Sequence, residues 1–192
     1  LHSQDRVRIE ASWLIQQKKV CPEYVPLVHC YDGTMSLIVM EYLAPPFQTL
    51  RKGILAGQIY PNMARQVAEF LSKSLFFTSA LAMSSEAYRR KVKEYHNPEM
   101  CRATEQVIFM DAYYDAPSNA YLKPELEEDV RDLRGDVAAK VAIGRLRNLF
   151  LSKTQALIHA DFHTGSVMAT QKELYIIDSE FAFYGPMAFD IG

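Results

Sequence analysis

Residues 159–166 read His-Ala-Asp-Phe-His-Thr-Gly-Ser, and residues 178–187 read Asp-Ser-Glu-Phe-Ala-Phe-Tyr-Gly-Pro-Met. Each stretch follows a short apolar run with the composition of a buried strand. A carboxylate at the end of an apolar strand is costly unless it binds a cation or accepts hydrogen bonds. We therefore expect a loop and a hairpin in which Asp161, Asp178 and Glu180 do chemistry.

This layout is the one that phosphoryl transfer needs. One carboxylate orients the acceptor hydroxyl, and further carboxylates hold Mg²⁺ against the phosphates of a nucleotide. Each residue also has a simpler interpretation when it is taken alone. Asp161 could cap a turn, His159 and His163 could be hydrogen-bonded imidazoles without a catalytic role, and Asp178 could begin a loop. Their combination favours the functional interpretation.

The rest of the chain predicts a mixture of helices and short strands. Apolar residues at helical spacing indicate helices over about 5–18, from Pro61 to about Leu81, and from Pro124 to about Leu151. The strands are expected as a hairpin of 25–31 and 37–40, whose second strand is buried, followed by 156–158, 167–168 and 174–177. Pro45 and Pro46 end the first hairpin.

Composition excludes several classes of protein. The 192 residues are 49% hydrophobic and carry 21 basic against 23 acidic side chains, so no basic surface for nucleic acid is expected. No run of about 18 apolar residues indicates a membrane span. Cys21, Cys30 and Cys101 have no spacing typical of a disulfide framework or a zinc site, which favours the cytoplasm. The chain begins at Leu1 without a methionine, and we expect it to be a piece of a longer protein.

The spacing from His159 through Asp161 to Ser166 is similar to the catalytic loop of the kinase-like phosphotransferases that act on small molecules. More narrowly, residues 163–167 together with 178–187 resemble the methylthioribose kinase family. The resemblance continues upstream and covers essentially the whole chain, through residues 5–10, 39–41, 51–53, 76–79 and 104–109.

The resemblance implies roles for the acidic cluster. Asp161 would be the catalytic carboxylate, and Asp178 and Glu180 would hold Mg²⁺. Ser166 stands where many relatives have a metal-binding Asn, and a serine hydroxyl is a weaker ligand for a hard cation. Glu10 resembles the glutamate that pairs with a strand lysine in a kinase small lobe.

The resemblance also implies a protein-kinase-like two-lobe fold of the α+β class. Residues 1–41 would form a partial N-terminal lobe of a helix and a hairpin. Residues 42–47 would form a hinge, with ATP held by the adenine-binding run Met40, Glu41, Tyr42 and Leu43. Residues 48–192 would form a mostly helical C-terminal lobe, incomplete at its end, that carries a catalytic β-hairpin.

Some family features are absent or altered in this sequence. The glycine-rich phosphate loop, the strand lysine and an arginine pair that contacts the sugar are not found, so the isolated fragment is expected to be inactive and poorly soluble. We also expect an unpaired face or edge at residues 37–40. Ala160 and Ala188 replace usual glycines, and a positive φ at either position would cost about 1 kcal/mol.

The expected activity is ATP-dependent phosphorylation of the anomeric hydroxyl of 5-methylthioribose, a step of methionine salvage. The family suggests a homodimer that binds a small sugar and neither nucleic acid nor membrane. Homoserine, choline or aminoglycoside kinases of the same fold are alternatives, as is a non-catalytic nucleotide-binding relative. A metal-dependent phosphatase would need Asp and then Thr or Val, two and four residues after Asp178, where this chain has Glu180 and Ala182.

Overall fold

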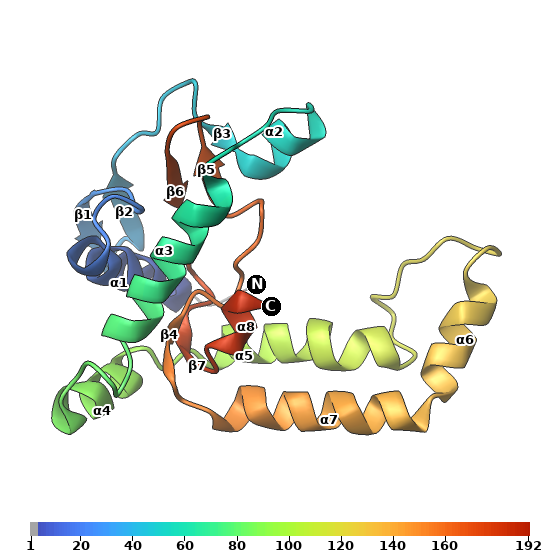
Figure 1. Cartoon of the computed structure of the whole chain (residues 1–192). Helices are drawn as coiled ribbons and strands as arrows, with labels where there is room; N and C mark the ends of the chain where they lie inside the picture. Colours follow the sequence, from blue (N-terminus) through green and yellow to red (C-terminus); the bar gives the residue numbers. More distant parts are fainter. Residues whose placement is uncertain (1–3) are drawn as a thin grey trace.

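The computed structural model describes residues 4–192, which form small antiparallel sheets surrounded by helices (Figure 1). The α+β class expected from the sequence is confirmed. The helices are α1 (Asp5–Val20), α2 (Leu50–Leu55), α3 (Met63–Phe77), α4 (Ser85–Glu94), α5 (Pro98–Thr104), the π-helix η1 (Glu105–Met110), the 3₁₀-helix η2 (Asp111–Tyr113), α6 (Glu127–Gly135), α7 (Val137–Ser152) and α8 (Ala188–Ile191). The strands are β1 (Val28–Asp32), β2 (Leu37–Met40), β3 (Gln48–Thr49), β4 (Ala156–Ile158), β5 (Val167–Ala169), β6 (Leu174–Ile176) and β7 (Phe183–Gly185).

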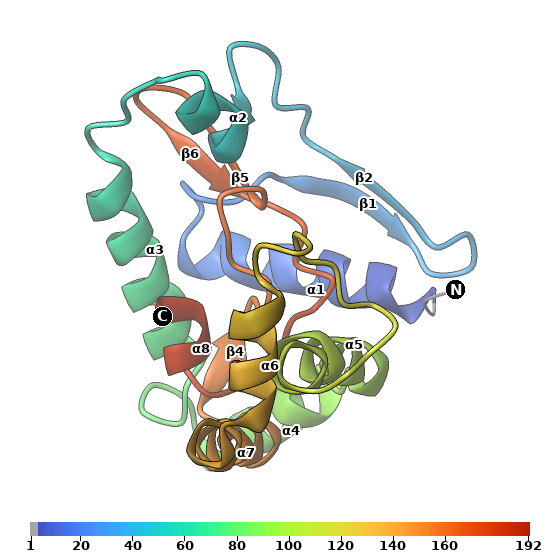
Figure 2. The same ribbon diagram turned by 90° about the vertical axis from the view of Figure 1, so that its right-hand side faces the viewer.

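The N-terminal part is a helix with a hairpin beside it. Strands β1 and β2 pair antiparallel, and Figure 2 shows the hairpin lying along α1. Helix α1 buries Ile9, Trp13 and Leu14 completely, as their helical spacing predicts. The expectation that β2 is buried is wrong, because Leu37 and Val39 are each 46% exposed. Only one face of a two-stranded hairpin can pack on α1, so the other face meets solvent, in agreement with the expected unpaired face.

The strands that hold the two acidic stretches form two small sheets. Strand β5 lies between β3 and β6, with Val167 opposite Ile176, while β4 pairs with β7. The sheets are cross-linked just beyond their strand ends, where Nε2 of His159 donates to the carbonyl of Ile177 at 2.9 Å. The loop that follows β4 and the segment that follows β6 therefore start side by side.

Buried apolar residues form one main core and a smaller cluster beside it. The main core joins α1 and α3 to the β5–β6 hairpin, through residues that include Trp13, Phe70, Val167 and Ile176. The smaller cluster packs β4 against the end of α3 and the start of α8, through Leu75, Ala156, Ile158 and Ala160 with Phe181, Phe183, Met187 and Phe189. The loop between β4 and β5 lies between these two clusters, which fixes both of its ends.

Helix α3 lies within the range predicted from Pro61 to Leu81 but ends earlier, at Phe77. Thr78 explains the end of the helix. Its Oγ1 donates to the carbonyl of Ser74 at 2.7 Å and accepts the N–H of Leu157 at 3.1 Å. The last turn of α3 is thereby attached to β4.

The single long helix predicted from Pro124 to Leu151 is wrong. The segment forms α6 and α7, which meet at a sharp angle at Asp136 (Figure 1). Asp136 has non-helical dihedral angles (φ −74°, ψ 100°), and its Oδ1 accepts the N–H of Ala139 at 2.9 Å. The apolar periodicity runs through both helices, but an aspartate after Gly135 starts a new helix as its N-cap.

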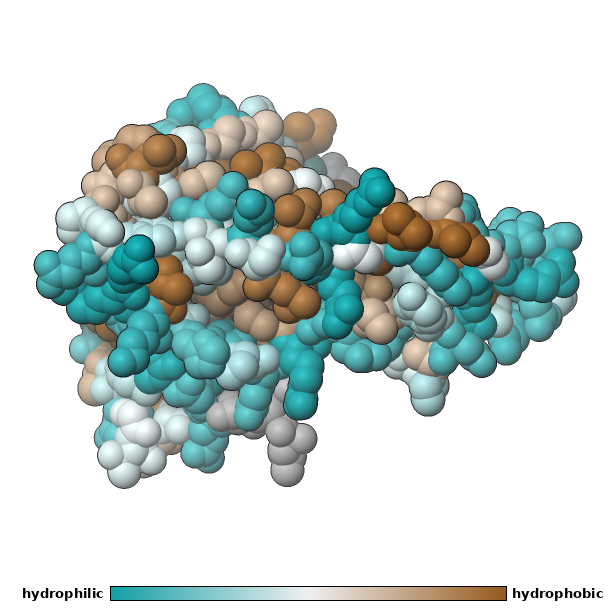
Figure 3. Space-filling model, turned by 90° about the horizontal axis from the view of Figure 1, so that it is seen from below, coloured by the Kyte–Doolittle hydropathy of each residue, from teal (hydrophilic) through white to brown (hydrophobic). Residues whose placement is uncertain are grey.

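Helix α7 pairs with α5 and η1 to form an arm that extends away from the sheets (Figure 1). Phe150 on its inner side is buried, but the predicted apolar stripe lies largely outside, where the exposed residues include Val137, Val141, Leu146 and Leu149. Figure 3, which views the molecule from the side of α7, shows hydrophobic groups at the surface along this arm. Within residues 4–192, no helix combines the length and apolarity needed to cross a bilayer.

Candidate active site

His159 is the first residue after β4 and ties the site together. Its side chain is 1% exposed, and its Nδ1 accepts the N–H of Asp161 at 3.3 Å while Nε2 donates to Ile177. Burial lowers the pKa of His159 to about 4, so the ring is neutral at neutral pH. His159 is therefore a structural cross-link between the loop after β4 and the segment after β6.

Ala160 adopts the left-handed conformation, with φ of 65°. The positive φ considered for this position in the sequence analysis is therefore present. Ala188, by contrast, lies in α8 and is not among the described residues with positive φ. Asp190 stabilises the turn, because its two carboxylate oxygens accept the N–H groups of His159 (2.6 Å) and Ala160 (2.9 Å). Burial raises the pKa of Asp190 to about 6.

Asp161 follows the left-handed residue in the loop after β4, and its side chain is 38% exposed. Burial raises the pKa of Asp161, the nearby His163 lowers it, and the charge of Asp178 raises it. The effect of Asp178 means that the predicted catalytic carboxylate and the first predicted metal ligand are electrostatic neighbours. A carboxylate in this position can accept a proton from a bound hydroxyl.

Ser166 is fully buried and holds the loop closed. Its hydroxyl lies within 2.9 Å of the carbonyl oxygens of Asp161 and His163 and accepts the N–H of His163 at 3.0 Å. Since a hydroxyl has one hydrogen and two lone pairs, these contacts leave at most limited capacity for a cation. Ser166 thus stabilises the loop through these hydrogen bonds. Its role as a metal ligand stays a prediction.

The acidic segment leaves β6 through Asp178, which also has φ of 65°. Two residues on, the carboxylate of Glu180 is paired with Arg6 of α1 at 3.3 Å. Glu10 lies one turn further along α1. Burial raises the pKa of Glu10 to about 7, with further upward contributions from the charges of Asp178 and Glu180, while Arg6 and a backbone hydrogen bond from Asp178 lower it. The fold therefore brings Glu10, Asp178 and Glu180 together.

These carboxylates fit a divalent cation. Mg²⁺ is bound by one or two carboxylates together with waters and substrate phosphates, and this site concentrates hard oxygen donors. Burial is the main cause of the raised pKa of Glu10, and the negative charges of Asp178 and Glu180 add a smaller contribution that a cation would offset. Within residues 4–192, no three His, Cys, Asp or Glu side chains lie close enough together to hold a metal ion, although Asp178 and Glu180 are within electrostatic range of Glu10, so Mg²⁺ here would also need waters and substrate phosphates.

The predicted adenine-binding run lies between β2 and β3. The N–H of Glu41 donates to the carbonyl of Leu27 at 2.8 Å, and Tyr42 is 82% exposed. The run is close to the β5–β6 hairpin, because the charge of Glu41 contributes, after burial, to the raised pKa of Tyr175 on β6. Met40, Glu41, Tyr42 and Leu43 line none of the cavities described for residues 4–192.

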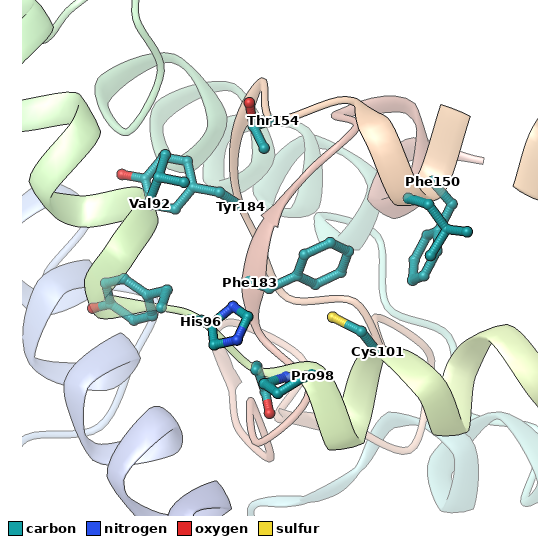
Figure 4. A pocket seen from close by; sticks show the side chains of 11 residues that line it. Val92, His96, Pro98, Cys101, Phe150, Thr154, Phe183 and Tyr184 are labelled. Carbon is teal, nitrogen blue, oxygen red and sulfur yellow. The ribbon is translucent and has the colours of Figure 1, made fainter. Parts of the chain in front are cut away.

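A cavity of about 230 Å³ lies instead beneath β7 (Figure 4). Its walls are mostly aromatic and aliphatic, with Phe150, Phe183 and Tyr184 on one side and His96, Pro98 and Cys101 near the start of α5. Burial raises the pKa of the Cys101 thiol to about 12, so this sulfur is unreactive. This volume is below the range typical of small-molecule sites.

Sequence reasoning missed three residues that shape the site. Asp190 holds the loop after β4, Arg6 pairs with Glu180, and Asn97 donates to the backbone of the acidic segment. Asp190 had a signal in the sequence, since it is a lone acid in the apolar run 187–191. Arg6 and Asn97 had none, because their partners lie 174 and 83 residues away.

A carboxylate on a fixed loop, beside other acidic residues, is the arrangement that phosphoryl transfer needs. The chain belongs to the phosphotransferase enzyme family (APH), whose family model matches residues 3–192. The fold is accordingly a partial two-lobe, kinase-like one.

Curated relatives narrow the comparison. The chain is 45% identical over 191 residues to methylthioribose kinase 1 of Oryza sativa subsp. japonica. This alignment covers 99% of the chain and 44% of the relative. The chain is 40% identical over 188 residues to the methylthioribose kinases of Bacillus pumilus and Yersinia enterocolitica, covering 98% of this chain and 47% of each relative. The chain thus spans about half the length of the curated relatives it matches.

Proposed function

We propose that the protein to which this chain belongs is an ATP-dependent kinase that phosphorylates the anomeric hydroxyl of 5-methylthioribose, yielding methylthioribose 1-phosphate in methionine salvage. The main structural support is the position of Asp161, whose carboxylate is within electrostatic reach of Asp178 on a neighbouring loop. The hydrogen bond from His159 to Ile177 joins the two loops. The choice of sugar rests on relatives that are named methylthioribose kinase.

In this proposal Asp161 is the catalytic residue. It accepts and orients the proton of the sugar hydroxyl, so that the oxygen faces the transferred phosphoryl group. Burial raises the pKa of Asp161, which makes the carboxylate a stronger base than an exposed aspartate. The hydrogen bonds around His159 and Asp190 keep the loop in one conformation, so that the carboxylate is placed before substrate arrives.

We further propose that Asp178 and Glu180, with Ser166, hold Mg²⁺, and that the run Met40 to Leu43 holds the adenine of ATP. When bound, ATP supplies the phosphoryl group and Mg²⁺ neutralises charge on its phosphates. Glu10 would pair with a lysine, whose positive charge would offset the burial and the charges of Asp178 and Glu180 that now raise the pKa of Glu10.

The division of the chain is part of the same proposal. Residues 1–41 form part of a small lobe, 42–47 the hinge and 48–192 the large lobe, and residues 1–3 lie outside the described residues. We propose a cytoplasmic homodimer whose partner is the sugar substrate, without a nucleic-acid or membrane partner.

The test is ADP release by the full-length protein with Mg²⁺ and ATP, offered methylthioribose, homoserine, choline and an aminoglycoside in parallel. We expect methylthioribose alone to drive release. Asp161→Asn should lower kcat by about 10²- to 10⁴-fold, the usual contribution of a positioned acid or base. Asp132→Asn is the matched control, since the Asp132 side chain is 75% exposed on α6.

If a different acceptor is phosphorylated, that acceptor and not methylthioribose is the substrate. ATP binding without phosphorylation of any acceptor would favour a non-catalytic relative. Full activity of Asp161→Asn would remove the assigned role of Asp161.

A further inference from the structure

The acidic segment 178–182 has a backbone that needs support. Asp178 is held at φ of 65°, in a sparsely populated left-handed region that aspartate tolerates better than most residues with a side chain. The turn closes through a hydrogen bond from the N–H of Ala182 to the carbonyl of Ser179 at 3.0 Å. Strained conformations of this kind persist only where the surroundings enforce them.

Asn97 supplies that support from a distant part of the chain. Its Nδ2 donates to the carbonyl of Glu180 at 2.9 Å and to the carbonyl of Ala182 at 3.1 Å. Both partners are acceptors, so the amide must present its NH₂ group to them, and both hydrogens are used. The side chain is buried, and its hydrogen bond to Ala182 is shielded from water while that to Glu180 is partly buried.

The side-chain amide of Asn97 does not cap the helix that Asn97 precedes. Asn97 is the N-cap of α5, a position at which asparagine commonly accepts an N–H of the first turn. Its side chain makes no such capping bond in this structure. The side chain is committed to the acidic segment instead.

Packing and one ion pair also hold the turn, because Ser179 and Ala182 are fully buried and Glu180 pairs with Arg6. Asn97 borders the cavity of about 230 Å³ beneath β7 and a second one of about 90 Å³ beside Arg6.

We propose that Asn97 is a positioning residue that fixes the carbonyls of Glu180 and Ala182 and so aims the carboxylates of Asp178 and Glu180 at a divalent cation. The inference rests on the proposed function for the identity of the cation. It does not depend on which sugar is phosphorylated.

The informative substitution is Asn97→Asp in the full-length protein. It keeps the shape of the side chain but places a carboxylate against two carbonyl oxygens, which turns two attractions into repulsions. Asn62→Asp is the matched control, because Asn62 is also an N-cap without a side-chain capping bond and is exposed at the start of α3. Asn97→Ser, which keeps one hydroxyl donor, serves if Asn97→Asp does not fold.

Two readouts are needed, and neither requires turnover. The first is the affinity for Mn²⁺, used as the probe for Mg²⁺ and followed by electron paramagnetic resonance. The second is hydrogen exchange of the amides of residues 178–183. For Asn97→Asp we expect Mn²⁺ affinity at least about tenfold weaker and exchange at least about tenfold faster, with smaller changes in the same direction for Asn97→Ser. Asn62→Asp should match wild type in both.

Wild-type Mn²⁺ affinity in the Asn97 variants would overturn the proposal, even if their Tm is lower, because Asn97 would then serve stability alone. Unchanged exchange in residues 178–183 would overturn it as well. If the exchange increases and the Mn²⁺ affinity falls while wild type phosphorylates no acceptor, the proposed function fails and the positioning role of Asn97 stands.

Discussion

The Nε2 atom of His163 lies 3.6 Å from Oδ2 of Asp161, and Nδ1 of the same ring accepts the N–H groups of Gly165 at 2.9 Å and Ser166 at 3.3 Å. A ring nitrogen that accepts two N–H groups cannot carry a proton itself. The other ring nitrogen, Nε2, is the one that faces Asp161. His163 closes the loop with one nitrogen and faces the proposed catalytic carboxylate with the other.

Replacing His163 should affect catalysis more than nucleotide binding. We expect His163→Ala to lower kcat by about tenfold, since Asp161 loses a charge neighbour at 3.6 Å and the turn loses two hydrogen bonds. The KM for ATP should stay within about twofold, because the ring does not belong to the proposed hinge. Steady-state kinetics of the full-length protein would check this, with His29→Ala in exposed β1 as control. A rise in the KM for ATP at constant kcat would contradict the expectation.

The alanine at position 160 should be nearly neutral compared with glycine. Ala160→Gly removes about 1–2 kcal/mol of left-handed strain, but it adds about 0.4–1 kcal/mol of unfolded-state entropy and loses a buried methyl group. The free energy of unfolding should change by less than about 1 kcal/mol. Ala160→Val should destabilise by more than about 2 kcal/mol, since a β-branched residue tolerates positive φ poorly.

Urea denaturation of the two variants would check both values. Equal stability of Ala160→Val and wild type would mean that position 160 does not need the left-handed conformation. A large gain from Ala160→Gly would mean instead that the strain of Ala160 outweighs both opposing contributions.

Asp190 should make stability depend on pH. Burial raises its pKa from 3.8 to about 6, so the folded protein binds a proton more tightly than the unfolded chain. The free energy of unfolding therefore falls as the pH rises from 3.8 to about 6, by about 3 kcal/mol in all. Asp190→Asn cannot titrate and should lack this component.

The measurement is urea denaturation of wild type and Asp190→Asn between pH 4 and pH 7. The stability advantage of wild type over the variant should shrink as the pH rises. Parallel stability profiles for the two proteins across this range would show that Asp190 has an ordinary pKa in the folded state.

The outer face of α7 should make the 192-residue chain self-associate. Val137 and Val141 are 72% and 50% exposed, and a helix that is apolar on its solvent side is usually covered in its native setting. We expect self-association that increases with concentration, measured by sedimentation velocity. The double substitution Val137→Lys and Val141→Lys should reduce it, whereas Gln171→Lys at an exposed polar position should not. A monomer at all concentrations would contradict this.

Local patterns were enough to predict α1, α3 and the strands β1, β2, β4, β5 and β6, whereas β3, β7 and the helices α2, α4, α5 and α8 were not predicted. The strand Ala156–Ile158 was predicted with its observed bounds, and the helix over 5–18 differs from α1 by two residues at its end. In both, the apolar pattern is uninterrupted, and the flanking residues mark where it ends. The predicted helix from Pro124 to Leu151 was wrong because the periodicity of side chains does not report a cap, and Asp136 breaks the backbone without breaking the stripe.

The candidate site was only partly predictable for a different reason. Asp161, Asp178 and Glu180 stand out because each is an acid at the end of an apolar run. Arg6 and Asn97 look ordinary in sequence, since a surface arginine and an N-cap asparagine are common. Their partners are set by the tertiary fold, which brings α1 and the start of α5 to the same five-residue turn.

Ala160 and Asp178 share the same φ of 65°, each two residues or fewer beyond the end of a strand. The consequence concerns which mutations the gene can accept. At both positions the left-handed backbone admits glycine, asparagine, aspartate and, at a cost, alanine, while valine, isoleucine and threonine are excluded by their branched side chains. A survey of random variants should therefore find these two codons among the least tolerant of the chain, even though neither side chain is large and one of them is only a methyl group.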